Sequence, residues 1–150
     1  MILMDIASLS FRTFAHATED EEKVAQALEF LSGTEEIERS RNEGYHGNPI
    51  IVMESKISRS REMRDFFASL PTPIIQRLLE TLDLRIDDES MFFLRLDKQA
   101  AYREIIELGV DDDIISIRGK IKSYPQSRDN ALKMMESILQ GELDRRTHKG

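Results

Sequence analysis

Apolar residues recur at two different periods along this chain, and the order of the two periods limits the folds that it can adopt. Strand-like patterns cover residues 5–14, 49–57 and 114–123, with a weaker one at 35–41. Helical apolar stripes cover residues 18–33, 58–70, 72–82 and 127–139. A hairpin is predicted over residues 84–96, followed by a helical turn over residues 98–102. Strands and helices therefore mix without regular βαβ alternation, which predicts an α+β fold with helices packed on a mostly antiparallel sheet.

The chain has 150 residues, of which 40% are hydrophobic, and this is enough for one domain with a substantial core. We expect a single α+β domain over residues 1–140 and a polar, frayed tail over residues 141–150. The absence of cysteine excludes disulfides, thiol catalysis and Cys-ligated zinc. No apolar stretch approaches a membrane span and the first residues lack a signal-peptide pattern, so we expect no membrane partner and a cytoplasmic location.

Negative charge is concentrated at one end of the sequence. The net charge is −7, from 28 acidic and 21 basic side chains, which taken as a whole argues against a nucleic-acid binder. Residues 1–55 alone hold 11 acidic and 4 basic side chains, whereas the remainder is balanced. Within the balanced part, bases cluster at residues 56–64 and again at residues 118–128. A local field of this kind can still attract a polyanion to one face of the protein.

The strand predicted at residues 114–123 separates its charged side chains from its apolar ones. Because side chains alternate along a strand, Arg118, Lys120 and Lys122 share the face opposite the isoleucines. Successive bases would lie roughly 7 Å apart, on the order of the spacing between successive phosphates of a nucleic-acid strand. The row therefore indicates phosphate contact. A solvated strand face, or an edge that lysine protects from aggregation, explains the same pattern equally well, and both interpretations stay open here.

The bases at residues 56–64 give a weaker indication. Lys56 precedes the predicted helix, and Arg61 points outward from it, where it can pair with Asp65 one turn later. An exposed pair of this kind is a common surface feature that contributes little to stability. We therefore place Lys56 and Arg61 in an RNA interface only if this helix lies beside the basic strand.

Histidines and acidic runs raise the question of catalysis. A Mg²⁺-dependent nuclease could use His16, Glu19 and Asp20, or the acids at residues 87–89 and 111–113. A helix first turn, a hairpin turn and a loop explain these runs more simply. No HExxH, P-loop, Rossmann glycine or GxSxG pattern occurs. We therefore expect no catalytic residue, no metal site and no cofactor, and keep the nuclease as the least favoured alternative.

Two further segments offer hydrogen-bonding groups to a ligand. The turn at residues 98–102 carries Lys98, Gln99 and Tyr102, although a capped helical turn is the simpler interpretation. The polar loop at residues 42–48 holds His46, which could stack on or hydrogen-bond to a ligand, while small turn-forming residues explain the loop equally well.

The chain also resembles an archaeal RNA-binding domain family, and the resemblance rests on HATEDEEKV at residues 16–24, GYHGNPI at 44–50 and LDKQAAY at 96–102. The segments DII at 113–115 and KIKSYP at 120–125 also fit, so it extends in order from about residue 5 to residue 140. The family is a former domain of unknown function whose members are described as predicted exosome subunits. It implies a fold similar to the ribosomal protein that binds the small RNA of the large subunit, an archaeal cytosolic setting, an RNA partner and no known catalysis. Residues 103–107 depart from the family pattern, in which a small residue and a glycine follow the tyrosine.

From the basic strand face and this resemblance, we expect a non-catalytic RNA-binding protein that docks on the phosphate backbone of structured RNA, linked to archaeal RNA processing or the exosome. The expected contacts are Arg118, Lys120 and Lys122, with Arg12 and Lys98 as helpers, His46 and Tyr102 at bases or sugars, and Lys56 and Arg61 as further candidates. The alternative is a protein–protein adaptor, or a homodimeric subunit of an RNA-processing complex, with the acidic first third as its partner surface.

Overall fold

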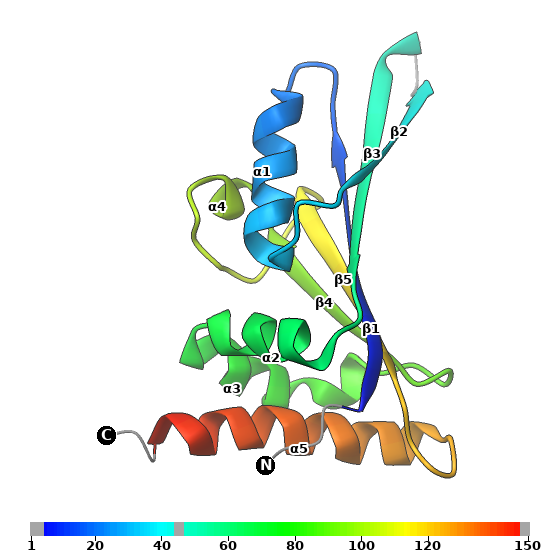
Figure 1. The fold of residues 1–150 in the computed structure, drawn as a ribbon, viewed down its shortest axis with the longest axis vertical. Coiled ribbons are helices and arrows are strands. Elements are labelled where there is room, and N and C mark those ends of the chain that lie inside the picture. The colour runs from blue at the N-terminus through cyan, green and yellow to red at the C-terminus, as the bar shows by residue number, and fades with distance from the viewer. Residues whose placement is uncertain (1–4, 44–46, 148–150) are drawn as a thin grey trace. The chain divides into compact units, whose positions relative to one another are not determined.

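The computed structural model describes residues 5–43 and 47–147 and has an α+β fold (Figure 1). Its helices are α1 (Glu21–Ser32), α2 (Ser60–Ser69), α3 (Thr72–Glu80), α4 (Lys98–Tyr102) and α5 (Arg128–Thr147), and the 3-10 turn η2 lies at Leu82–Leu84. Its strands are β1 (Ile6–Ala15), β2 (Glu38–Glu43), β3 (Pro49–Ile57), β4 (Met91–Asp97) and β5 (Ile114–Ile121). The strands form an antiparallel sheet in the order β2-β3-β1-β5-β4, which confirms the predicted fold class.

Within this fold the chain forms two compact units. The first unit comprises Met1–Leu9, Ser58–Leu94 and Arg118–Gly150, and the second comprises Ser10–Ile57 and Arg95–Ile117. Strands β1, β4 and β5 contribute residues to both units, so each unit is assembled from segments far apart in the sequence. Among the described residues, no helix is both long enough and apolar enough to span a membrane.

Helix α5 packs against both α3 and α2 in the first unit (Figure 1). Met63, Phe66 and Phe67 of α2 are buried, as its helical stripe predicts, and the two phenylalanine rings meet edge to face with their centres 5.3 Å apart. Helix α3 likewise buries Ile75 and Leu78 of its predicted stripe. The helical periods in the sequence thus identify the core-facing sides of both helices.

Helix α1 packs on β3 and α4 in the second unit. Its predicted stripe is buried, since Val24, Leu28 and Leu31 are at most 3% exposed. The helix begins after Asp20, whose carboxylate accepts hydrogen bonds from two backbone N–H groups of the first turn and so caps the helix. It ends at Gly33, whose φ of 77° lies in the left-handed region that favours glycine.

The predicted hairpin forms only in part. Its first arm was expected at residues 84–86, but the chain instead continues from α3 into η2, and Leu84 is 83% exposed. Only Ile86 makes a bridge, to Phe92, among the described residues of that arm. The expected turn does form, because the Asp87 carboxylate accepts hydrogen bonds from two backbone N–H groups that follow it.

The frayed tail expected after residue 140 is also corrected, because α5 remains helical as far as Thr147. Glu142 is 9% exposed and pairs with Arg145 and Arg146. Burial by itself would raise the pKa of the Glu142 carboxyl, but the hydrogen bonds from the two arginines outweigh it and hold the pKa below its ordinary value. Arg146 also donates to the carbonyl oxygens of Phe67 and Ala68, and these bonds attach the last turns of α5 to the end of α2.

Candidate nucleic-acid interface

Strand β5 has the two-faced character that its sequence predicts. Ile115, Ile117 and Ile121 are fully buried, and Gly119 lies on the same side, where an added Cβ would come within 2.9 Å of Leu9 Cδ2. The alternate positions carry exposed bases, first Arg118 and Lys120 within the strand and then Lys122 directly after it. These three side chains are named the β5 basic row from here on, and all three belong to the first unit.

The positive charges of the β5 basic row are not neutralised by acidic side chains of the described residues. Within residues 5–43 and 47–147, none of its three side chains makes an ion pair or a side-chain hydrogen bond, whereas Arg39 and Arg41 both pair with Glu21. An unpaired surface base can neutralise a phosphate and release counterions without first giving up an internal contact. This row is therefore the part of the expected interface that the geometry favours most.

Arg12 on β1 is exposed but already has partners. Its guanidinium Nε lies 3.7 Å from the Glu54 carboxylate, and the centre of the guanidinium lies 5.5 Å from the centre of the Phe14 ring. Because both charged side chains of the pair are 55% exposed, their attraction is weak. Arg12 remains a candidate for phosphate contact, in competition with Glu54.

Lys98 has a place different from the one expected. Its side chain is 1% exposed, and its ammonium donates to Phe14 O at 2.9 Å and Glu19 Oε1 at 2.8 Å, with Asp113 Oδ1 also at 2.8 Å. An ammonium has three protons, and all three have an acceptor here. No donor of Lys98 is left for a phosphate, so the structure removes it from the candidate interface.

Tyr102 completes the group around the buried Lys98 ammonium, named the Lys98 cluster and made of Lys98, Glu19, Asp113 and Tyr102. The Tyr102 hydroxyl donates to the second oxygen of the Glu19 carboxylate, and burial together with this bond raises the pKa of the phenol. Its hydroxyl is therefore occupied and is a poor candidate for a base or sugar. Lys98 is 79 positions from Glu19 in the sequence, and Tyr102 is 83 positions from it. The spacing of residues in the sequence gives no sign of contacts over such separations.

The same cluster explains the acids that suggested a nuclease. Burial would raise the pKa of both Glu19 and Asp113, but the hydrogen bond and charge of Lys98, together with the other hydrogen bonds that each carboxylate accepts, outweigh it and hold each pKa below its ordinary value. Asp20 is engaged as the cap of α1. Among the residues that the structure describes, no group of three His, Asp or Glu side chains is arranged to hold a metal ion.

The remaining expected contacts are divided between the units. Lys56 is exposed on β3 in the second unit, and Arg61 is exposed on α2 in the first, where it makes no ion pair with any described residue. His46 lies outside the described residues.

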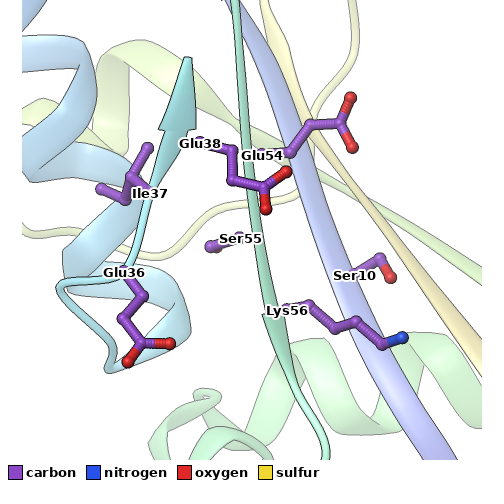
Figure 2. A pocket seen from close by; sticks show the side chains of 7 residues that line it. All are labelled: Ser10, Glu36, Ile37, Glu38, Glu54, Ser55 and Lys56. Carbon is purple, nitrogen blue, oxygen red and sulfur yellow. The ribbon is translucent and has the colours of Figure 1, made fainter.

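A pocket of about 350 Å³ in the second unit has the opposite charge (Figure 2). Three glutamates, Glu36, Glu38 and Glu54, line it together with the single base Lys56. Ser55, which is 5% exposed, lies at its wall, and its hydroxyl has no hydrogen-bond partner in the described part of the chain. Its carboxylates repel phosphate, so RNA should avoid this pocket.

Comparison with known proteins gives the family. The sequence profile of a family described as RNA binding matches residues 8–121, which include β1 from its third residue, the other four strands, and the β5 basic row as far as Lys120. The chain belongs to this RNA-binding family. This membership confirms the resemblance seen in the sequence.

Individual proteins that are similar to this chain support the same family membership. The RNA-binding protein PAB1135 of Pyrococcus abyssi is 36% identical over 145 residues, covering 90% of this chain and 94% of the relative. The structure of Mth689, a DUF54 protein from Methanothermobacter thermautotrophicus, matches with a TM-score of 0.79 at 36% identity, over 89% of this chain and 98% of the other. The crystal structure of AF2318 from Archaeglobus fulgidus, another DUF54 protein, matches with the same TM-score of 0.79 at 30% identity, over 89% of this chain and 99% of the other.

Proposed function

We propose that this protein binds structured RNA without catalysis, by docking the β5 basic row on the phosphate backbone. Its family is described as RNA binding, and one relative carries that name. The observation that carries the proposal is that Arg118, Lys120 and Lys122 are all exposed and make no ion pair or side-chain hydrogen bond with any described residue, in a chain whose net charge is −7. Other exposed bases such as Lys23 and Arg64 are likewise unpaired with described residues, but these three lie in a row on one strand face, where they can contact successive phosphates.

Phosphate docking suits structured RNA because double-helical RNA is recognised mainly through its shape, its phosphates and its 2′-hydroxyls. If each of the three bases neutralises one phosphate, log affinity should fall against log salt with a slope of about −2 to −3. The same slope should be found for hairpins of unrelated sequence, because phosphate contacts do not depend on base identity.

The proposal is tested by measuring the affinity for an RNA hairpin at several salt concentrations. The double variant Arg118→Glu with Lys120→Glu should weaken binding by about tenfold or more at 0.1 M salt and flatten the slope. The matched control is Lys23→Glu with Arg64→Glu, which changes the net charge equally at two exposed bases outside the row. If both double variants weaken binding equally, net charge and not the row attracts the RNA, and the proposal is wrong.

We further propose that this binding serves archaeal RNA processing, as an accessory to enzymes such as those of the exosome. The family resemblance supports this proposal. An accessory role is supported because Glu19 and Asp113, which belong to the acidic runs that suggested a nuclease, pair with Lys98 instead. Affinity purification of the intact protein, with and without RNase treatment, tests it. RNase-sensitive recovery of RNA-processing enzymes is the expected result, and recovery of RNA alone would contradict it.

A second candidate function is an adaptor that holds a basic protein partner at the acidic pocket of the second unit. It is favoured by the three glutamates and the unpartnered buried hydroxyl of Ser55 in that pocket. The double variant Glu36→Lys with Glu38→Lys should then abolish an RNase-resistant complex. Retention of that complex, or a purely RNase-sensitive one, would remove this candidate.

A further inference from the structure

We propose that a groove beside Tyr124 holds one unpaired nucleotide of the RNA, with its base stacked on the Tyr124 ring and its phosphate between Lys122 and Lys133. This inference rests on the proposed function and specifies its substrate class, namely structured RNA that carries an unpaired nucleotide at the end of a helix. The groove measures about 380 Å³ and lies within the first unit, between the segment after β5 and helix α5. Tyr124 and Lys133 lie beyond the residues that the family profile matches, which end at 121.

Tyr124 presents an unused aromatic surface at this groove. Its side chain is 93% exposed, and it makes no hydrogen bond or ring contact with any described residue. A tyrosine ring usually covers apolar surface in its own protein, and this one instead leaves both faces to solvent. Every nucleobase has a flat face that can stack on such a ring, so an exposed tyrosine among basic side chains suits an unpaired nucleotide.

Two lysines supply the charge that a phosphate needs. Lys122 and Lys133 both line the groove and are exposed, and neither is paired with an acid among the described residues. Asp5 is the single acid of the lining, so the groove carries a net positive charge. The charge therefore favours an anion, whereas the acidic pocket of the second unit disfavours one.

Hydrogen-bonding groups of the groove are also left without partners. Ser123 is 6% exposed, lies at the wall, and its buried hydroxyl has no partner within the described chain. Asn130, which also lines the groove, donates from its amide nitrogen to Pro125 O at 2.8 Å, and its side-chain oxygen accepts no hydrogen bond from any described residue. A buried polar group without a partner is uncommon, and a ligand that brings the partner is one explanation of it.

Continuity with the β5 basic row determines the kind of RNA. Lys122 belongs both to the row and to the groove, so a backbone that follows Arg118, Lys120 and Lys122 leads to Tyr124. Bases inside a duplex are stacked on their neighbours and are not available to an external ring. The row therefore takes the helical part of the RNA, and the groove takes the first unpaired nucleotide beyond it.

The test compares two RNAs, a blunt hairpin and the same hairpin with a short single-stranded overhang, against the full protein. Tyr124→Ala should weaken binding of the overhang RNA by about 5- to 150-fold, the range expected for losing one stacked base, and that of the blunt hairpin by less than twofold. Tyr124→Phe, which keeps the ring, should bind as the unaltered protein does. Val110→Ala, at another side chain that is 93% exposed, controls for the loss of exposed apolar surface.

A fluorescent 2-aminopurine placed at the first unpaired position gives a direct readout of stacking. Its emission should be quenched on binding to the unaltered protein and to Tyr124→Phe, and should stay unquenched with Tyr124→Ala. If the blunt hairpin binds with the expected salt dependence but Tyr124→Ala leaves overhang affinity and quenching unchanged, the groove proposal fails and the proposed function stands. If neither RNA binds, both fail.

Discussion

Lys98 and Lys120 are identical side chains that the two units place in opposite surroundings. Lys98 is 1% exposed and its ammonium contacts three oxygens, from Phe14, Glu19 and Asp113. Lys120 is exposed on β5 and has no charged partner within the described residues. Taking an ammonium out of water requires compensating charges and hydrogen bonds at close range, so Lys98 is committed to the fold. An exposed ammonium needs none, so Lys120 stays available to a ligand.

The largest effect is expected for Lys98→Met, which keeps much of the length of the side chain and removes its charge. Glu19 and Asp113 would then lose their shared cation, but their side chains are 18% and 36% exposed and stay partly solvated. The expected loss is therefore about 1.5–3 kcal/mol, that of hydrogen bonds to charged groups, and not the larger cost of breaking a fully buried pair. We expect the free energy of unfolding, measured by urea denaturation at pH 7, to fall by about this amount. Lys120→Met is the matched control and should change it by less than about 0.5 kcal/mol. Equal losses in the two variants would mean that the two lysines do not differ in role.

Low pH should weaken the ion pairs of the Lys98 cluster and so reduce the loss of stability caused by Lys98→Met. The pKa values of Glu19 and Asp113 are lowered in the folded protein. Their contribution to stability is therefore fully present above the unfolded pKa values of about 4, and is lost as the pH falls through the lower folded values. The difference in unfolding free energy between the unaltered protein and Lys98→Met should accordingly narrow from pH 6 to pH 3. A difference that stays constant over this range would show that the carboxylates do not depend on Lys98.

Arg118→Gln should have the smallest effect, and it falls on RNA binding alone. Removing one of three phosphate contacts should reduce the slope of log affinity against log salt by about 0.7–0.9 and leave the free energy of unfolding within about 0.5 kcal/mol. Arg118→Lys keeps the charge and should keep the slope. A change of stability without a change of slope would place Arg118 with the structural bases and not with the β5 basic row.

Features that depend on near neighbours in the chain were predictable. The buried stripe of α1 and the alternation along β5 follow from the spacing of apolar residues, and both are confirmed. The prediction of a first hairpin strand at residues 84–86 was wrong because the chain forms the 3-10 turn η2 directly after α3. A short apolar pattern alone does not distinguish such a turn from a strand. The frayed tail predicted from residue 141 is helical as far as Thr147. Arg146 donates there to Phe67 O, 79 residues away, and a polar segment gives no sign of such a contact.

The sequence by itself determined that Arg118, Lys120 and Lys122 share one face, because alternation along a strand is a property of the backbone. Only the tertiary structure decided that Lys98 is internal. The oxygen of Phe14 that binds it is 84 residues distant, and folding brings the two together. Tertiary structure likewise collected Tyr124 and Lys133 around one groove. The availability of a charged side chain depends on groups brought close by folding, and the spacing of residues in a sequence does not specify those groups.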